Sequence, residues 1–82
     1  MTFRKVDAGR VIHHIGEMVW VKETGKVPVC SILRYISINN ERIELVGRKI
    51  PFDSIEQIRL FSGQVLYENR KTVGLAGLRR SV

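Results

Sequence analysis

Apolar and polar side chains alternate along residues 32–46, which is the clearest pattern in the chain. Asn39-Asn40 interrupts the alternation, and asparagine tolerates the positive φ that a two-residue type I′ hairpin turn requires. The cross-strand pairs predicted with these two residues at the tip are Ile38 with Glu41, Ser37 with Arg42, Ile36 with Ile43 and Tyr35 with Glu44. Most apolar residues then share one face of an antiparallel hairpin, and Tyr35 shares the other with polar residues.

The period of the pattern changes further along the chain. Alternation breaks at Asp53-Ser54 and resumes at Ile58. A short helix capped by Ser54 would explain the break. A single 3₁₀ turn over residues 53–56, followed by a strand over residues 57–61, explains it as well. Isoleucines are poor helix formers in so short a segment, so we favour the turn followed by a strand.

The remaining apolar segments are residues 10–15, 18–22, 27–33, 64–67 and 70–73. We treat the first as a strand. Thr24-Gly25, between the second and the third, predicts a hairpin turn, and the third can continue into the 32–46 hairpin as one long, bent strand. The last two would form a hairpin around Glu68-Asn69.

Strands of this length and number define the expected fold class. We expect a mostly β protein, a small SH3-like or Sm-like barrel of five or six short antiparallel strands, with at most a short 3₁₀ turn or helix near residues 53–62. Closing the sheet removes edges that an 82-residue chain could not otherwise protect. We expect one domain over residues 1–82, with a flexible basic end over residues 74–82.

A hydrophobic motif closes the segment from Ser31 to Leu60. Its positions are Ile50, Phe52, Asp53, Ile55 and Ile58. Together with the preceding strand and short hairpin, the motif resembles the C-terminal β-motif of the YolD-like family. The helical segment that precedes the motif in that family is absent from this chain. The resemblance implies an Sm-like barrel and supplies no catalytic residue.

Charge is unevenly distributed along the chain. Fourteen lysine and arginine residues against eight acidic residues give a net charge of +6. The excess lies in residues 1–40 and residues 69–82, and such a field attracts nucleic acid, acidic protein surfaces or anionic lipid. No apolar stretch is long enough to cross a bilayer, so we expect a cytoplasmic protein without membrane contact. The single cysteine, Cys30, lies in an apolar run and is expected to be a small buried residue.

Catalytic and metal-binding patterns are not evident in the sequence. His13-His14 would point to opposite faces of a strand and so could not chelate one metal ion together. We find no nucleophile-and-base arrangement, no paired carboxylates and no glycine-rich phosphate loop. We therefore expect a protein that is not an enzyme and that holds no metal and no cofactor.

Two aromatic residues and six cations are candidates for contact with nucleic acid. Tyr35 shares its predicted hairpin face with Arg42 and would stack on a base. Trp20 is either a second stacking platform or a large apolar anchor in the core. The candidate phosphate ligands are Arg48, Lys49, Arg70, Lys71, Arg79 and Arg80.

Two functional hypotheses follow from these residues. The first is a non-catalytic module that binds RNA or DNA with little base specificity, since the sequence has no recognition helix and no aromatic RNP signature. The alternative is a small adaptor or inhibitor that binds a larger, acidic protein. An exposed apolar face around Trp20, Leu60 and Phe61 would favour the alternative. Strand edges would also allow a homo-oligomer.

Overall fold

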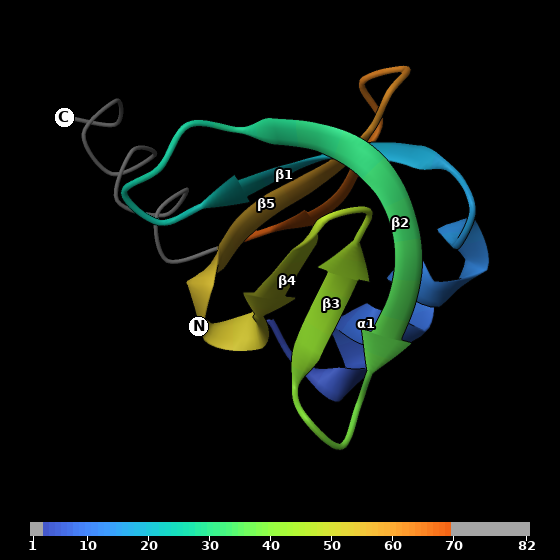
Figure 1. Ribbon diagram of the computed structural model, residues 1–82, viewed down its shortest axis with the longest axis vertical. Coiled ribbons are helices and arrows are strands. Elements are labelled where there is room, and N and C mark those ends of the chain that lie inside the picture. Colours follow the sequence, from blue (N-terminus) through green and yellow to red (C-terminus); the bar gives the residue numbers. More distant parts are fainter. Residues whose placement is uncertain (1–2, 70–82) are drawn as a thin grey trace, which may run out of the picture.

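One antiparallel sheet of six strands makes up most of the protein (Figure 1). The structure is a computed structural model and describes residues 3–69. The strands follow the order β4-β3-β2-β1-β5-β6. The elements are α1 (Lys5–Val11), η1 (Ile12–His14), β1 (Met18–Glu23), β2 (Val29–Ser37), β3 (Arg42–Leu45), β4 (Arg48–Pro51), η2 (Phe52–Ser54), β5 (Ile55–Leu60) and β6 (Val65–Glu68). The prediction of a mostly β protein is confirmed. The predicted strand over residues 70–73 and the basic end over residues 74–82 lie outside the described residues.

Strand β2 joins the two parts of the sheet. Its first half pairs with β1, from Val29 to Ile32, and its second half pairs with β3, from Leu33 to Ser37. Figure 1 shows it arching over the molecule as one long, bent strand, as the sequence predicts. Because the strand bends, the outer faces of the β1 half and the β3 half of the sheet point in different directions.

A bulge in β2 shifts the alternation of side chains. Leu33 pairs with Leu45 while Tyr35 pairs with Glu44, so Arg34 is an extra residue in the ladder. Leu33 is buried on one side of the bulge and Ile36 on the other, and the two residues between them are exposed. A bulge allows a strand to bend and still keep its apolar residues on the core side.

The break in the alternation of apolar residues after residue 52 comes from a 3₁₀ turn followed by a second bulge. The 3₁₀ turn η2 is followed directly by β5, so the turn-then-strand prediction is confirmed and the helical alternative is wrong. Both elements begin one or two residues earlier than predicted. In β5, Gln57 pairs with Lys22 and Ile55 pairs with Glu23, which leaves Glu56 as the bulge residue. Ile55 and Ile58 therefore both face the core.

The hairpin of β2 and β3 has the predicted register but a different turn. Ser37 pairs with Arg42, and the next two predicted pairs follow in order. Among the described residues only Glu41 has a positive φ without being glycine, at 51°, so both asparagines keep negative φ values and the type I′ prediction is wrong. The Oγ atom of Ser37 accepts a hydrogen bond from the Asn40 N–H. A four-residue turn that ends in a left-handed residue replaces the two-residue turn.

The N-terminal segment is helical, so the strand predicted over residues 10–15 is wrong. The backbone N–H of Arg4 donates to Asp7 Oδ2 at 2.8 Å, which anchors the first turn of α1. Ala8 and Val11, three residues apart, are buried on one face of the helix. Packing of this face against the sheet outweighs the modest helix propensity of the β-branched residues around it.

Three aromatic rings connect the two ends of the sheet. The ring of Phe3 lies 4.8 Å from Phe52, just after β4, and 4.8 Å from Tyr67 on β6, both in edge-on geometry. Strands β4 and β6 are the two ends of the strand order, and no pairing joins them within residues 3–69. The N-terminal aromatic residue thus fills the space between these ends with apolar contact. The rest of the core consists of inward side chains of the sheet and of α1, with Val19, Leu33, Ile43, Ile50 and Ile58 fully buried.

Tyr67 makes stability sensitive to alkaline pH. Burial, with a smaller contribution from the charge of Asp7, raises the pKa of the Tyr67 hydroxyl above its usual value near 10, and Arg4 opposes this. The folded state therefore holds the phenol proton more tightly than the unfolded chain does, so this stability is present below pH 10 and is lost as the pH rises through the folded pKa. We expect urea unfolding to show that the free energy of unfolding falls between pH 8 and pH 11, and that it falls less in the Tyr67→Phe variant. Equal slopes for the two proteins would contradict this expectation.

Candidate functional site

Trp20 lies on the outer face of the sheet. Val19 and Val21, its neighbours on β1, are fully buried, and alternation along the strand turns the indole to the opposite side. It is half-buried there and is not part of the core. The interpretation of Trp20 as a core anchor is wrong.

Exposed apolar side chains surround Trp20 on this outer face. Met18 pairs with Ile32 of β2, and the carbonyl of Met18 accepts a hydrogen bond from the Phe61 N–H. Val65 of β6 lies across from β5 on the same side. We call Met18, Trp20, Ile32, Phe61 and Val65 the apolar face.

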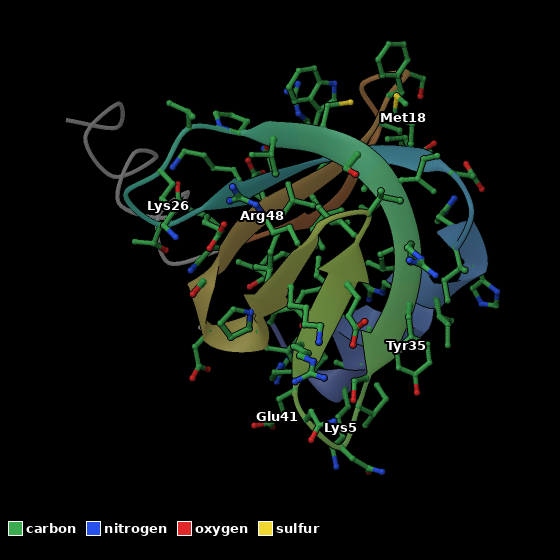
Figure 2. The ribbon with its side chains drawn as sticks, in the orientation of Figure 1. Lys5, Met18, Lys26, Tyr35, Glu41 and Arg48 are labelled. Carbon is green, nitrogen blue, oxygen red and sulfur yellow. The ribbon has the colours of Figure 1, made fainter. Side chains whose placement is uncertain are left out.

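The apolar face is unusually open to solvent. Phe61 is 65% exposed, and the Met18, Ile32 and Val65 side chains are each 41–46% exposed. Figure 2 shows Met18 projecting from the end of the molecule opposite Lys5 and Glu41. Contiguous exposed apolar surface is uncommon on monomeric proteins beyond a few hundred Å², and the larger patches mark protein or ligand interaction sites. Leu60, which we expected here, is half-buried and packs against the core instead.

Arg59 is the cation within the apolar face. It pairs directly with Trp20 on β1 and with Val65 on β6 and is half-buried between them. No ion pair involves it among residues 3–69. The sequence could have indicated Arg59 only after the register of β1 and β5 was known.

The polar end of the same outer surface is internally paired. Lys22 Nζ lies 3.9 Å from Glu56 Oε1, and Gln57 Nε2 donates to Glu68 Oε2 at 2.8 Å. Lys22 and Glu56 offset each other's charge, and the Glu68 carboxylate accepts a hydrogen bond from the neutral Gln57 amide, so the described residues of this end offer no unpaired cation to an anionic ligand.

Arg48 holds the two parts of the sheet together. Its Nη1 atom lies 3.1 Å from Oε1 of Glu23, a buried carboxylate at the end of β1, although β4 and β1 are not neighbours in the sheet. Lys26 Nζ lies 3.5 Å from the other oxygen of Glu23. Figure 2 shows Arg48 and Lys26 on the same side of the molecule. The predicted phosphate ligand Arg48 therefore already has an anionic partner.

We expect Arg48→Met to lower the free energy of unfolding by about 1–2 kcal/mol, because Glu23 would stay buried with Lys26 alone as its partner. The double variant Glu23→Gln with Arg48→Met should lose less than the sum of the single losses, by about 1 kcal/mol. Urea denaturation of the four proteins gives this coupling. Strictly additive losses would show that the ion pair contributes nothing.

Tyr35 and Lys49 lie on the outer face of the other part of the sheet. Tyr35 is 55% exposed and lies opposite Glu44, which in turn lies opposite Lys49. Arg42 Nε is 3.3 Å from Glu44 Oε2. Because of the bulge, the consecutive residues Arg34 and Tyr35 are both exposed, whereas strict alternation would turn one of them toward the core.

The two candidate stacking residues are not brought together. Trp20 pairs with Cys30, and Cys30 precedes Tyr35 by five residues on the bent strand β2, roughly 16 Å of chain. Cys30 is half-buried beside Trp20 and not fully buried as predicted. The candidate ligands Arg70, Lys71, Arg79 and Arg80 lie outside the described residues.

Most of the positive excess is not on the described surface. Residues 3–69 contain ten lysine and arginine residues and eight acidic residues, a net charge of +2. Five of the ten cations are within 4 Å of a carboxylate oxygen. Residues 3–69 therefore carry a weaker positive field than the whole sequence suggests.

Metal-binding chemistry finds no support in the described region. Within residues 3–69 no three histidine, cysteine or acidic side chains are grouped so that they could hold a metal ion. His13 and His14 lie in η1, and His14 Nδ1 is 3.1 Å from Glu17 Oε2. In the same range no helix is long and apolar enough to cross a membrane.

Comparisons of the chain with protein-family models, with curated proteins and with solved structures find no match. The resemblance to the YolD-like family therefore stays a prediction.

Proposed function

We propose that this protein is a small protein-binding module, an adaptor or inhibitor, that docks on a larger, acidic partner through its apolar face. The observation that carries the proposal is the exposure of Met18, Ile32 and Phe61 around Trp20 on one side of a sheet. Tryptophan, phenylalanine, methionine and arginine are the residue types enriched at the centres of protein–protein interfaces. Solvent exposure of this set is hard to explain by folding alone.

The finer fold proposed is an Sm-like or SH3-like barrel. The strongly bent β2, the 3₁₀ turn between β4 and β5 and the aromatic contacts between the ends of the sheet support it. Barrels of this class bind peptides as well as nucleic acid, so the fold is compatible with the proposed function without selecting it.

A photo-crosslinking amino acid at position 61 tests the proposal. In nuclease-treated extract, we expect it to capture a discrete acidic protein, whereas the same group at position 49, on the other part of the sheet, should not. The captured protein, once purified, should bind the Phe61→Ser variant about 30-fold more weakly, which is the loss of about 2 kcal/mol typical of a central interface residue. Tyr35→Ser, a change of another exposed aromatic residue on the other part of the sheet, is the matched control. Equal losses for both variants would exclude the apolar face as the docking surface.

The second candidate is binding of RNA or DNA by the opposite part of the sheet. The observation that favours it is the bulge, which places Arg34 beside the exposed Tyr35, with Lys49 two strands away. If cations after residue 69 also contact the backbone, about five phosphates would be neutralised and log K would fall with log salt at a slope of roughly −4. Titration of single-stranded oligonucleotides at low salt measures this slope, and no binding there would exclude the candidate.

A homo-oligomer through strand edges stays a prediction. Edge strand β4 has only four residues and exposes Lys49 and Pro51, features that protect an edge against pairing with another chain.

A further inference from the structure

Arg59 has an environment that no other cation of the described chain shares. Its neighbours across both adjacent strands are apolar, Trp20 on one side and Val65 on the other. A guanidinium in such a setting presents a planar set of hydrogen-bond donors that matches a carboxylate. Partial removal from water strengthens the attraction for an incoming negative charge.

None of the acidic residues in the described part of the chain forms an ion pair with Arg59. The two on neighbouring positions of this surface, Glu56 and Glu68, already contact Lys22 and Gln57. Glu41 lies at the far end of the molecule from Met18 (Figure 2). The guanidinium of Arg59 is therefore available to a carboxylate from another molecule.

A second copy of the chain does not fit this requirement. A symmetric dimer through the apolar face would bury two copies of Arg59 in the same interface, with no acidic partner for either among the residues of that face. Like charges in a desolvated interface cost several kcal/mol, and the chain already has a net charge of +6. Charge complementarity therefore indicates a different, acidic molecule as the occupant.

Resting on the proposed function, we infer that Arg59 makes the apolar face specific for a partner segment that carries one aspartate or glutamate flanked by apolar side chains. The carboxylate would accept hydrogen bonds from the guanidinium, and the flanking side chains would cover Met18, Ile32 and Phe61. Apolar contact then supplies affinity, and the arginine supplies the choice of partner.

Selection from a phage library of randomised linear peptides tests the inference with the full chain as bait. The wild-type protein should enrich peptides with an acidic residue between apolar ones. Arg59→Glu should enrich lysine or arginine at that position instead, and Arg59→Gln should keep the apolar preference without an acidic one. Arg34→Glu, a charge reversal at an exposed site outside the apolar face, should select the same peptides as the wild type.

Affinities of one selected peptide complete the test. Arg59→Gln should weaken binding at least about 10-fold, whereas Arg59→Lys, which keeps the charge, should lose less. Replacing the acidic residue of the peptide by its amide should remove most of the difference between wild type and Arg59→Gln. Thermal unfolding of each variant confirms that the comparison is between folded proteins.

The two proposals fail in different ways. Apolar peptides without acidic enrichment, bound by wild type and Arg59→Gln alike but not by Phe61→Ser, would overturn the role of Arg59 and leave the docking face intact. Selected peptides that bind Phe61→Ser and Met18→Ser as well as the wild type, or a selection without sequence bias, would count against the docking face itself.

Discussion

Phe3→Ala is expected to lower the free energy of unfolding by about 3–4 kcal/mol. Phe3 is 2% exposed, and its ring contacts those of Phe52 and Tyr67 edge-on. The substitution removes a large buried side chain and two aromatic contacts from the junction between the ends of the sheet. Since small domains are stable by only about 5–15 kcal/mol, urea unfolding should show a large fraction of total stability lost.

Val6→Ala is the control for this prediction. Val6 lies on α1 close to Phe3 in sequence but is 57% exposed, so the change should alter stability by no more than about 0.5 kcal/mol. If the two variants unfold at the same urea concentration, the aromatic junction contributes little, and the ends of the sheet are held by other contacts.

The sequence was most informative where burial and local geometry agree. The β2–β3 hairpin has a register that alternation alone predicts, because a slip of one residue would expose Ile36 and Ile43 together. The turn before β5 was also predictable, since Asp53-Ser54 interrupts an apolar pattern that resumes soon after.

The helix α1 was not predictable from its pattern. Its apolar face consists of two small residues, Ala8 and Val11, and gains its stability by packing against the sheet. The N-terminal Phe3 gave no signal of its role, because its partners at Phe52 and Tyr67 are distant in sequence.

The candidate site depended on information that one strand cannot supply. Alternation on β1 leaves open which face is buried, so Trp20 could be assigned to either side until Val19 and Val21 were seen in the core. The positions of the cations in the sequence do not indicate which of them have acidic partners. Arg48, for example, pairs with Glu23, 25 positions away. Exposure of Met18 and Phe61 became meaningful only when the sheet placed them together.

Replacement of Ile55 should cause the second large loss of stability, and it tests whether β5 contains the bulge. Strict alternation backward from Ile58 would place Ile55 on the solvent side, whereas the bulge at Glu56 places both isoleucines in the core, with Ile55 at 1% exposure. We therefore expect Ile55→Ala to lower the free energy of unfolding by about 3 kcal/mol.

Ile32→Ala is the matched control, because Ile32 is the same residue type on the outer face of the sheet, 41% exposed. It should cost about 1 kcal/mol or less, since the substitution leaves no cavity in the core. Equilibrium urea unfolding, followed by Trp20 fluorescence, measures both losses on one scale. An Ile55→Ala loss no larger than that of Ile32→Ala would show that β5 runs without the bulge and that Ile55 faces the solvent side.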